Sequence, residues 1–330
     1  MNIAFFETQL WEKEQLQLIF PDAKIDDSPL SEENASEFTD ITIISLFIYS
    51  KITKAILDKL PNLKYIVTRS TGYDHIDIEA CKAQNIVVSN VPEYGSNTVA
   101  EFTFGLLLDV TRNITRSILE AKQLNFDHEK LRGVDLYDKT IGIIGLGKIG
   151  QNVLSIARGF GMKVLVYNHS QNEELAKTLQ FSYTDLDTLL QNSDFITLHV
   201  PLMKETIHII NTENILKCKK GSFLINTARG GLVDTQAILL GLEQGILAGV
   251  GLDVLEGEDE LIDEVTLLHE QYQNVSKMKT LLYNHILLTH PKVLITPHNA
   301  FNSQEALQRI LDVTVENIRS FENNTTQNTI

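Results

Sequence analysis

Ten short apolar segments alternate with helix-like segments along the whole chain, and this alternation constrains the fold more than any other feature. The strand-like segments begin near residues 2, 41, 63, 86, 139, 163, 194, 221, 247 and 292. Several are nearly continuous Val, Ile and Leu, which is typical of parallel strands covered by helices on both faces. Ten strands are more than a single sheet usually contains, and a length of 330 residues is typical of two domains. The sequence therefore predicts an α/β fold with two doubly wound parallel sheets.

Two long helices are expected outside this regular alternation. The segment from Asn97 to Lys122 contains no proline, and its apolar residues recur at helical spacing. We predict one continuous helix of about 39 Å there, which would connect the two domains. A second amphipathic helix is expected from Ser303 to Phe321, with Ser303 as its N-cap, followed by a frayed end over residues 322–330.

Charge and cysteine content exclude several classes of protein. Lys and Arg total 28 and Asp and Glu total 43, so the net charge of −15 disfavours nucleic acid or an anionic membrane as partner. Cys81 and Cys218 form neither a disulfide framework nor a zinc motif, which favours a reducing cytoplasm and buried thiols. No signal peptide or membrane-spanning run is expected. The acidic run 256–264 matches no calcium loop, so no metal site is predicted.

A glycine turn is the strongest single motif. Gly145, Gly147 and Gly150 form GxGxxG between an apolar strand and a helix, and a second strand follows at residue 163. The first glycine permits the tight turn, the second lets the backbone approach a pyrophosphate, and the third allows the helix to pack closely on the strand. The segment is predicted to bind a dinucleotide.

Asn168 departs from the usual form of this motif. An Asp or Glu normally ends the second strand and holds the ribose hydroxyls, whereas Asn168 stands here, 18 residues after Gly150. An uncharged amide does not repel a 2′-phosphate, so we expect some NADP use. NADH should remain preferred, because no Lys or Arg follows nearby and the next charged residues are Glu173 and Glu174.

Polar residues at the ends of strands are the candidates for chemistry, because ligands bind beyond the carboxyl ends of parallel strands. They are His199, Arg229, Asp253, Glu258 and His298. An Arg can grip a carboxylate with two hydrogen bonds, a His can transfer the proton of a hydroxyl, and a Glu beside that His stabilises the imidazolium. Spacing alone does not decide whether His199 or His298 is the acid/base.

These motifs resemble the D-isomer-specific 2-hydroxyacid dehydrogenases, and within them the D-lactate dehydrogenase group. The resemblance covers nearly the whole chain and rests on RSTGYDHID, NVPEYGSNTVAEFTFGLLL, GLGKIG, LHVPL, INTARGGLVDTQAI, GLDVLEGE and TPHNAF. It implies a Rossmann dinucleotide domain, residues 94–300, inserted into a flavodoxin-like substrate domain, residues 1–93 and 301–330. It also implies an active site in the cleft between the domains and a homodimer formed through the dinucleotide domains.

The resemblance also implies a role for individual residues. Arg229 would hold the substrate carboxylate, His298 would be the acid/base, and Glu258 would pair with it. The implied cofactor residues are Gly145, Gly147, Lys148, Ile149, Gly150, Asn168, His199, Val200, Pro201, Thr206, Thr227, Ala228 and Asp253, the last at the nicotinamide end. The implied substrate residues are Thr71 and Gly72, through backbone N–H groups, together with Tyr49, Tyr94, Arg229 and Phe301.

The expected activity is NADH-dependent reduction of pyruvate to D-lactate. Glyoxylate, hydroxypyruvate and branched 2-oxo acids are alternative substrates for the same chemistry. An alternative of another class is an NAD-sensing corepressor that binds protein partners, since related folds of that class can retain the same three residues. The stretch 259–296 is longer than is typical of the family, so one or two extra helices are expected there, over the cleft or at a subunit contact.

Overall fold

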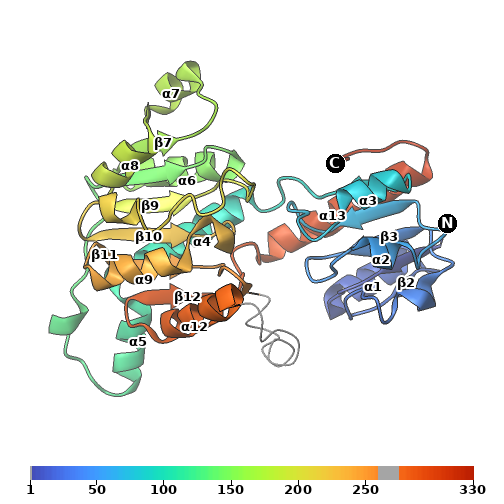
Figure 1. Ribbon diagram of the computed structural model, residues 1–330, viewed down its shortest axis with the longest axis horizontal. Coiled ribbons are helices and arrows are strands. Elements are labelled where there is room, and N and C mark those ends of the chain that lie inside the picture. Colours follow the sequence, from blue (N-terminus) through green and yellow to red (C-terminus); the bar gives the residue numbers. More distant parts are fainter. Residues whose placement is uncertain (1, 259–274) are drawn as a thin grey trace. The chain divides into compact units, whose positions relative to one another are not determined.

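The computed structural model describes residues 2–258 and 275–330, and the chain divides into two compact units (Figure 1). Unit 1 comprises Met1–Gly95 and Asn302–Ile330, and unit 2 comprises Ser96–Phe301. These divisions lie next to the boundaries expected from the sequence, after residues 93 and 300. Among the described residues, no helix is long and apolar enough to cross a membrane.

Unit 1 contains a five-stranded parallel sheet in the order β2-β1-β3-β4-β5, which is the flavodoxin-like order. Its strands are β1 (Ile3–Phe5), β2 (Lys24–Ile25), β3 (Ile43–Leu46), β4 (Tyr65–Thr68) and β5 (Val87–Ser89). The sequence predicted all of them except β2. That strand has only two residues, neither of them fully buried, so it leaves no apolar run.

Helices cover both faces of this sheet because successive side chains of each strand point to opposite sides. Ile3 and Phe5 pack with α1 (Leu10–Ile19) and α13 (Gln304–Glu322), whereas Ala4 packs with the helices of the other face. Those helices are the 3-10 turn η1 (Ala35–Phe38), α2 (Lys54–Leu57) and α3 (Ile78–Ala83). Ser303 caps α13 as predicted, with its hydroxyl accepting from the Ala306 N–H.

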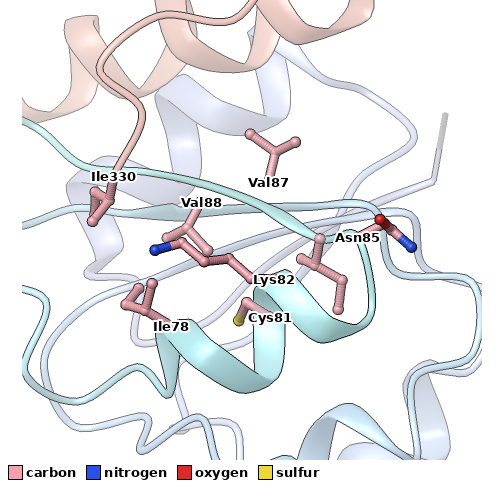
Figure 2. Close-up of a pocket in the computed structure, with 8 residues that line it drawn as sticks. Ile78, Cys81, Lys82, Asn85, Val87, Val88 and Ile330 are labelled. Atoms are coloured by element: carbon pink, nitrogen blue, oxygen red, sulfur yellow. The ribbon is translucent and has the colours of Figure 1, made fainter.

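The end of the chain is ordered, so the prediction of a frayed end was wrong. Thr329 bridges Ser89 of β5, and the Ile330 N–H donates to the Val88 carbonyl at 3.0 Å. Figure 2 shows Ile330 beside Val88, at a surface pocket that Cys81 also lines. The polar composition of the tail hid the fact that β5 is an edge strand whose backbone groups need partners. Burial raises the pKa of the Cys81 thiol to about 11, so this pocket offers no thiolate nucleophile.

Unit 2 contains a seven-stranded parallel sheet in the order β12-β11-β10-β9-β6-β7-β8, which extends the Rossmann order by one strand. Its strands are β6 (Thr140–Ile144), β7 (Lys163–Tyr167), β8 (Ser182–Tyr183), β9 (Phe195–Leu198), β10 (Ser222–Asn226), β11 (Leu247–Leu252) and β12 (Val293–Ile295). All but the two-residue β8 were predicted. The α/β fold is therefore a Rossmann domain inserted into a flavodoxin-like domain.

Helices cover both faces of the second sheet (Figure 1). One face packs on α4 (Ser96–Arg112) and α6 (Lys148–Gly159). The other packs on α8 (Leu186–Asn192), α9 (Thr235–Glu243) and α12 (Val275–Thr289). The remaining elements are α5 (Ile114–Lys122), η2 (Glu129–Leu131), α7 (Glu173–Leu179), η3 (Ile215–Lys217) and η4 (Gly230–Leu232).

The predicted continuous helix from Asn97 to Lys122 was also wrong, because the helix breaks at Asn113. This residue is left-handed, with φ of 53°, a conformation that Asn tolerates better than most residues. The Asp109 carboxylate then accepts hydrogen bonds from the Thr115 N–H and hydroxyl, at 2.7 and 2.5 Å, and so caps the start of α5.

The prediction of extra helices over residues 259–296 falls partly outside the described residues, which exclude 259–274. The remainder contains α12, which packs against α9 through the buried Leu287.

Candidate active site

The glycine turn has the geometry that its sequence predicts. Gly145 lies at φ of +100°, and a Cβ atom there would come within 2.8 Å of the His199 carbonyl. A Cβ atom on Gly150 would lie 2.1 Å from the Gly145 oxygen, so only glycine lets α6 pack this closely. A Cβ atom on Gly147 would meet nothing within 4 Å, which leaves open space at the start of α6. The turn therefore fits a pyrophosphate at the N-terminus of the helix.

Asn168 braces this turn. Its Oδ1 atom accepts from the Leu146 N–H at 3.0 Å, and its Nδ2 atom donates to the Ser170 carbonyl at 2.6 Å. The sequence suggested only a contact with the ribose and missed this structural role. Both polar atoms of the amide are thus already engaged within the protein.

His298 and Glu258 form a close pair in the loops that follow β12 and β11. The Nδ1 atom of His298 lies 2.8 Å from Oε1 of Glu258, and both side chains are about one-third exposed, at 28% and 35%. The second oxygen of Glu258 accepts from the Leu255 N–H at 3.2 Å, which fixes the carboxylate. With Nδ1 facing a carboxylate, the Nε2 atom of the imidazole is the one that can exchange a proton with a substrate.

Asp253 holds the turn that carries His298. Its buried carboxylate accepts from the Thr296 hydroxyl and from the N–H groups of Asn299 and Ala300, both at 2.8 Å. The His298 N–H donates to the Asp253 carbonyl at 2.8 Å, and His298 has a left-handed φ of 50°. Burial raises the pKa of Asp253. The resemblance implies that Asp253 lies at the nicotinamide end, which stays a prediction, and the structure adds its hydrogen bonds to the turn of His298.

His199 has different surroundings. Its Nε2 atom lies 2.9 Å from the Thr197 hydroxyl, and its buried Nδ1 atom has no hydrogen-bond partner among the described residues. Burial lowers its pKa to about 3, so the imidazole is neutral at pH 7. A neutral, buried ring is a poor proton donor, so the geometry favours His298 over His199 as the acid/base.

The loop after His199 forms a compact turn beside the glycine motif. Val200 lies against the position that a Gly145 Cβ would occupy. The Thr206 hydroxyl donates to the Pro201 carbonyl at 2.7 Å and accepts from the Met203 N–H at 2.8 Å. These three candidate cofactor residues therefore share one ordered loop.

Arg229 stands just beyond β10, in a tightly packed turn. The Asn226 side chain donates to the Arg229 carbonyl at 2.8 Å and accepts from the Ala228 N–H at 3.0 Å. These bonds fix the backbone from which the Arg229 side chain extends. A Cβ atom on Gly230 would lie 2.0 Å from the Leu255 backbone, so the turn directly abuts the segment that leads to Glu258. Arg229 is half-buried. Of the other candidate cofactor residues, Thr227 has its hydroxyl 2.8 Å from that of Thr103, and Ile149 of α6 packs against the core.

A second His–Glu pair was missed by the sequence analysis. His208 Nε2 lies 2.6 Å from Glu256 Oε1, and the other Glu256 oxygen accepts from the Thr235 hydroxyl at 3.0 Å. The pair ties together three loops at the same edge of the sheet. The only signal in the sequence was the acidic run 256–264, which does not show which residue it faces.

The candidate substrate residues of unit 1 lie in ordered loops. The Thr71 hydroxyl donates to the Val91 carbonyl at 2.9 Å, and the Gly72 carbonyl accepts from the Ser70 hydroxyl at 2.6 Å. The Tyr94 carbonyl accepts from Arg309 Nε of α13 at 2.7 Å. Tyr49 follows β3 and is 57% exposed. Phe301 is the last residue of unit 2 and is half-buried.

No group of three His, Cys, Asp or Glu residues suited to a metal ion occurs in the described parts of the chain, 2–258 and 275–330. The residues of the acidic run from 259 onwards lie outside those parts.

Comparisons with known proteins agree with this arrangement. The family model described as "D-isomer specific 2-hydroxyacid dehydrogenase, NAD binding domain" matches residues 104–300. A D-specific alpha-keto acid dehydrogenase of Enterococcus faecium is 39% identical over 91% of this chain and 89% of its own. A glyoxylate reductase of Thermofilum pendens is 37% identical over 88% and 81%. The structure of an Aquifex aeolicus D-lactate dehydrogenase complexed with NAD and lactic acid superposes with a TM-score of 0.86, at 38% identity over 98% of this chain and 96% of the other. The chain belongs to the family of D-isomer-specific 2-hydroxyacid dehydrogenases, and residues 104–300 are its NAD-binding domain.

Proposed function

We propose that the protein reduces pyruvate to D-lactate with NADH. The observation that carries the proposal is the His298–Glu258 pair, held in unit 2 beside the turn of Arg229. The similarity to the D-lactate dehydrogenase of Aquifex aeolicus supports this choice of substrate. The similarity to a glyoxylate reductase keeps glyoxylate as the second candidate.

In the proposed reaction, NADH supplies a hydride to the carbonyl carbon of the 2-oxo acid. His298 donates a proton from Nε2 to the carbonyl oxygen, so that the C=O bond becomes C–OH. Glu258 stabilises the imidazolium before the transfer, because its carboxylate is fixed 2.8 Å from Nδ1. Arg229 holds the substrate carboxylate with two hydrogen bonds, and the Thr71 and Gly72 N–H groups are the proposed further donors to it.

The test is a comparison of kcat/KM for pyruvate, glyoxylate, hydroxypyruvate and a branched 2-oxo acid, followed by the loss of NADH absorbance. We expect pyruvate to give the highest value and the product to be D-lactate, measured with an enantiomer-specific assay. A higher value for another 2-oxo acid would overturn the choice of substrate. Failure to reduce any 2-oxo acid, with NADH still bound, would favour the corepressor alternative.

We also propose that two copies associate through α5 and the loop that follows it. Ile114, Ile118 and Leu119 on α5 are 44–53% exposed, and Leu124 and Phe126 beyond it are 82% and 76% exposed. Such a concentration of exposed apolar side chains is typical of an interaction surface, and a second copy of the chain is the proposed partner. Ile118→Glu should convert a dimer into a monomer in sedimentation velocity, whereas Lys122→Glu on the same helix should not. A wild-type monomer would refute the proposal.

Cys81 and Cys218 are both free and buried, which supports the proposed cytoplasmic location.

A further inference from the structure

The sheet of unit 1 has a topological switch point between β1 and β3. The chain passes from β1 to β2 on one side and then to β3 on the other, so the loops after β1 and β3 diverge at the carboxyl edge. In doubly wound sheets this crevice is where ligands bind, and loop N–H groups there commonly hold an anion. The proposed reaction gives no role to the loop after β1, which carries Glu7.

The carboxylate of Glu7 occupies the crevice. Its Oε1 atom accepts from the N–H groups of Phe47 and Ser50 at 3.2 and 2.9 Å, and also from the Ser50 hydroxyl. Its Oε2 atom accepts from the Tyr49 N–H at 2.9 Å. The loop over residues 47–50, which we call the β3 loop, thus surrounds a carboxylate with four donors, as a loop would surround a bound anion.

The backbone around Glu7 is fixed for this purpose. Glu7 has a left-handed φ of 55°, which is uncommon for a residue with a long side chain. Arg69, only 1% exposed, donates to the carbonyls of Phe6 and Glu7 at 2.7 and 2.9 Å. Its guanidinium group also lies 3.4 Å from the buried Glu12 carboxylate.

Burying such a group of charges is seldom the most stable way to fill a core, since well-packed apolar residues often do better. The buried Arg69 guanidinium group instead holds the loop after β1 in one conformation, through its hydrogen bonds to the Phe6 and Glu7 carbonyls. That conformation directs the Glu7 side chain across the switch point to the β3 loop.

We propose that Glu7 is an internal ligand: its carboxylate fills the anion site at the switch point of unit 1 and thereby fixes the β3 loop with Tyr49. Glu7 is then a positioning residue, and it acts on the choice of 2-oxo acid through Tyr49. That second consequence rests on the proposed function, whereas the internal ligand itself does not. Without the Glu7 side chain, the same site should take a small monocarboxylate such as acetate or propionate.

The first experiment measures the site itself, by hydrogen exchange of the backbone amides in the β3 loop. Glu7→Gly suits the left-handed φ and removes the side chain, and Glu7→Gln keeps its shape without the charge. We expect exchange at Phe47, Tyr49 and Ser50 to accelerate by about tenfold or more in both variants, because hydrogen bonds to a charged group contribute on that scale. Exposed Glu14 on α1 provides the matched control, and Glu14→Gln should leave these amides unchanged.

Propionate added to Glu7→Gly should restore slow exchange in the β3 loop, and propionate added to the wild type should change nothing there. Unchanged exchange in both Glu7 variants, or no response of Glu7→Gly to propionate, would overturn the internal ligand. If Glu7→Gly does not fold, Glu7→Gln decides through its exchange rates. A merely structural role would give no rescue by a free carboxylate.

The second experiment measures substrate choice, as the ratio of kcat/KM for pyruvate to that for the bulkier phenylpyruvate. We expect both Glu7 variants to narrow this ratio by about fivefold, since a loosened loop discriminates less between side chains. NADH affinity should be unchanged. Equal loss for both substrates would refute the link to selectivity. A wild-type protein that reduces no 2-oxo acid would refute the proposed function, while the exchange and rescue measurements would still test the internal ligand.

Discussion

The loops after β9 and β12 each carry a histidine within two residues of a proline, yet the two rings have different surroundings. His298 faces a carboxylate at 2.8 Å and keeps part of its surface exposed. His199 has only a hydroxyl partner, and burial lowers its pKa to about 3. Position at the end of a strand therefore does not identify an acid/base. Burial keeps the His199 ring neutral at pH 7, whereas the His298 ring lies within hydrogen-bonding distance of a carboxylate.

The strongest way to break this comparison is to remove each ring in turn. His298→Gln should lower kcat for pyruvate by roughly 10²–10⁴-fold, the usual effect of losing a general acid, and should leave NADH affinity unchanged. His199→Gln should lower kcat by less than about tenfold, because it removes no proton donor. Steady-state kinetics and NADH fluorescence titrations measure both. Reversed effects would identify His199 as the acid/base.

Arg229 lies in the loop after β10, and Arg229→Lys tests whether this residue binds the substrate directly. An ammonium cannot make two parallel hydrogen bonds to a carboxylate, so kcat/KM for pyruvate should fall by about 10²-fold. The Michaelis constant for NADH should hardly change. Arg158→Lys at the end of α6 is a control, since that guanidinium group donates to the Leu179 carbonyl and to the Gln180 side chain. Equal loss of affinity for NADH and pyruvate would mean that Arg229 shapes the fold.

The two histidines should also differ in how they link pH to stability. The pKa of His199 lies well below the value of about 6.5 expected in the unfolded chain, so the unfolded state binds the proton first as the pH falls. Its contribution to stability is complete above about pH 6.5 and is lost between there and about pH 3, by on the order of 1 kcal/mol per pH unit. Urea unfolding at pH 7 and pH 5 should show a smaller difference for His199→Gln than for the wild type or His298→Gln. Identical differences would contradict the burial argument.

Glu258→Gln sharpens the comparison at the active ring. Without its carboxylate partner the ring loses the group that orients it and compensates its charge, so kcat/KM for pyruvate should fall, by about tenfold at pH 8 and by less at lower pH. A pH–rate profile of kcat/KM gives the answer. Glu256→Gln is the control, because Glu256 pairs with His208 instead. If the pH–rate profile of Glu258→Gln matched that of the wild type, the His298–Glu258 pair would have no part in the mechanism.

The smallest effect is expected at the cofactor. Asn168→Asp should raise the ratio of kcat/KM for NADH over NADPH by about threefold to tenfold, chiefly by lowering activity with NADPH through charge repulsion. It should also cost about 1 kcal/mol of stability, because the donor to Ser170 is lost. Asn172→Asp places a charge in the same loop and still caps α7, so it is the matched control. An unchanged ratio would mean that Asn168 only braces the glycine turn.

Regular features of the sequence predicted most of this molecule. Apolar runs predicted the ten longer strands. The glycine spacing predicted the turn before α6, in which Gly145 and Gly150 leave no room for a side chain. The two missed strands, β2 and β8, are too short to leave a pattern. The break at Asn113 depends on a single left-handed residue and a capping carboxylate, neither of which disturbs helical periodicity.

Features that depend on which residues meet in space were not accessible from the sequence. Nothing in the spacing distinguishes His199 from His298, because burial and a partner 40 residues away make the difference. The role of Glu7 likewise depends on contacts with residues 47–50, in the loop after the neighbouring strand β3. The docking of the tail on β5 depends on an edge strand more than 200 residues earlier in the chain.

The way unit 1 is assembled from both ends of the chain has a consequence for synthesis in the cell. The face of its sheet that carries Phe5 and Tyr65 is covered in part by Leu311 and Ile318 of α13, which are synthesised more than 200 residues after the sheet. Unit 2 is continuous and can fold as soon as residue 301 has emerged. The first 95 residues therefore wait through the translation of about 200 more while the part of this face that α13 covers is still exposed. Chaperones that hold apolar surfaces on nascent chains would act mainly on this waiting segment.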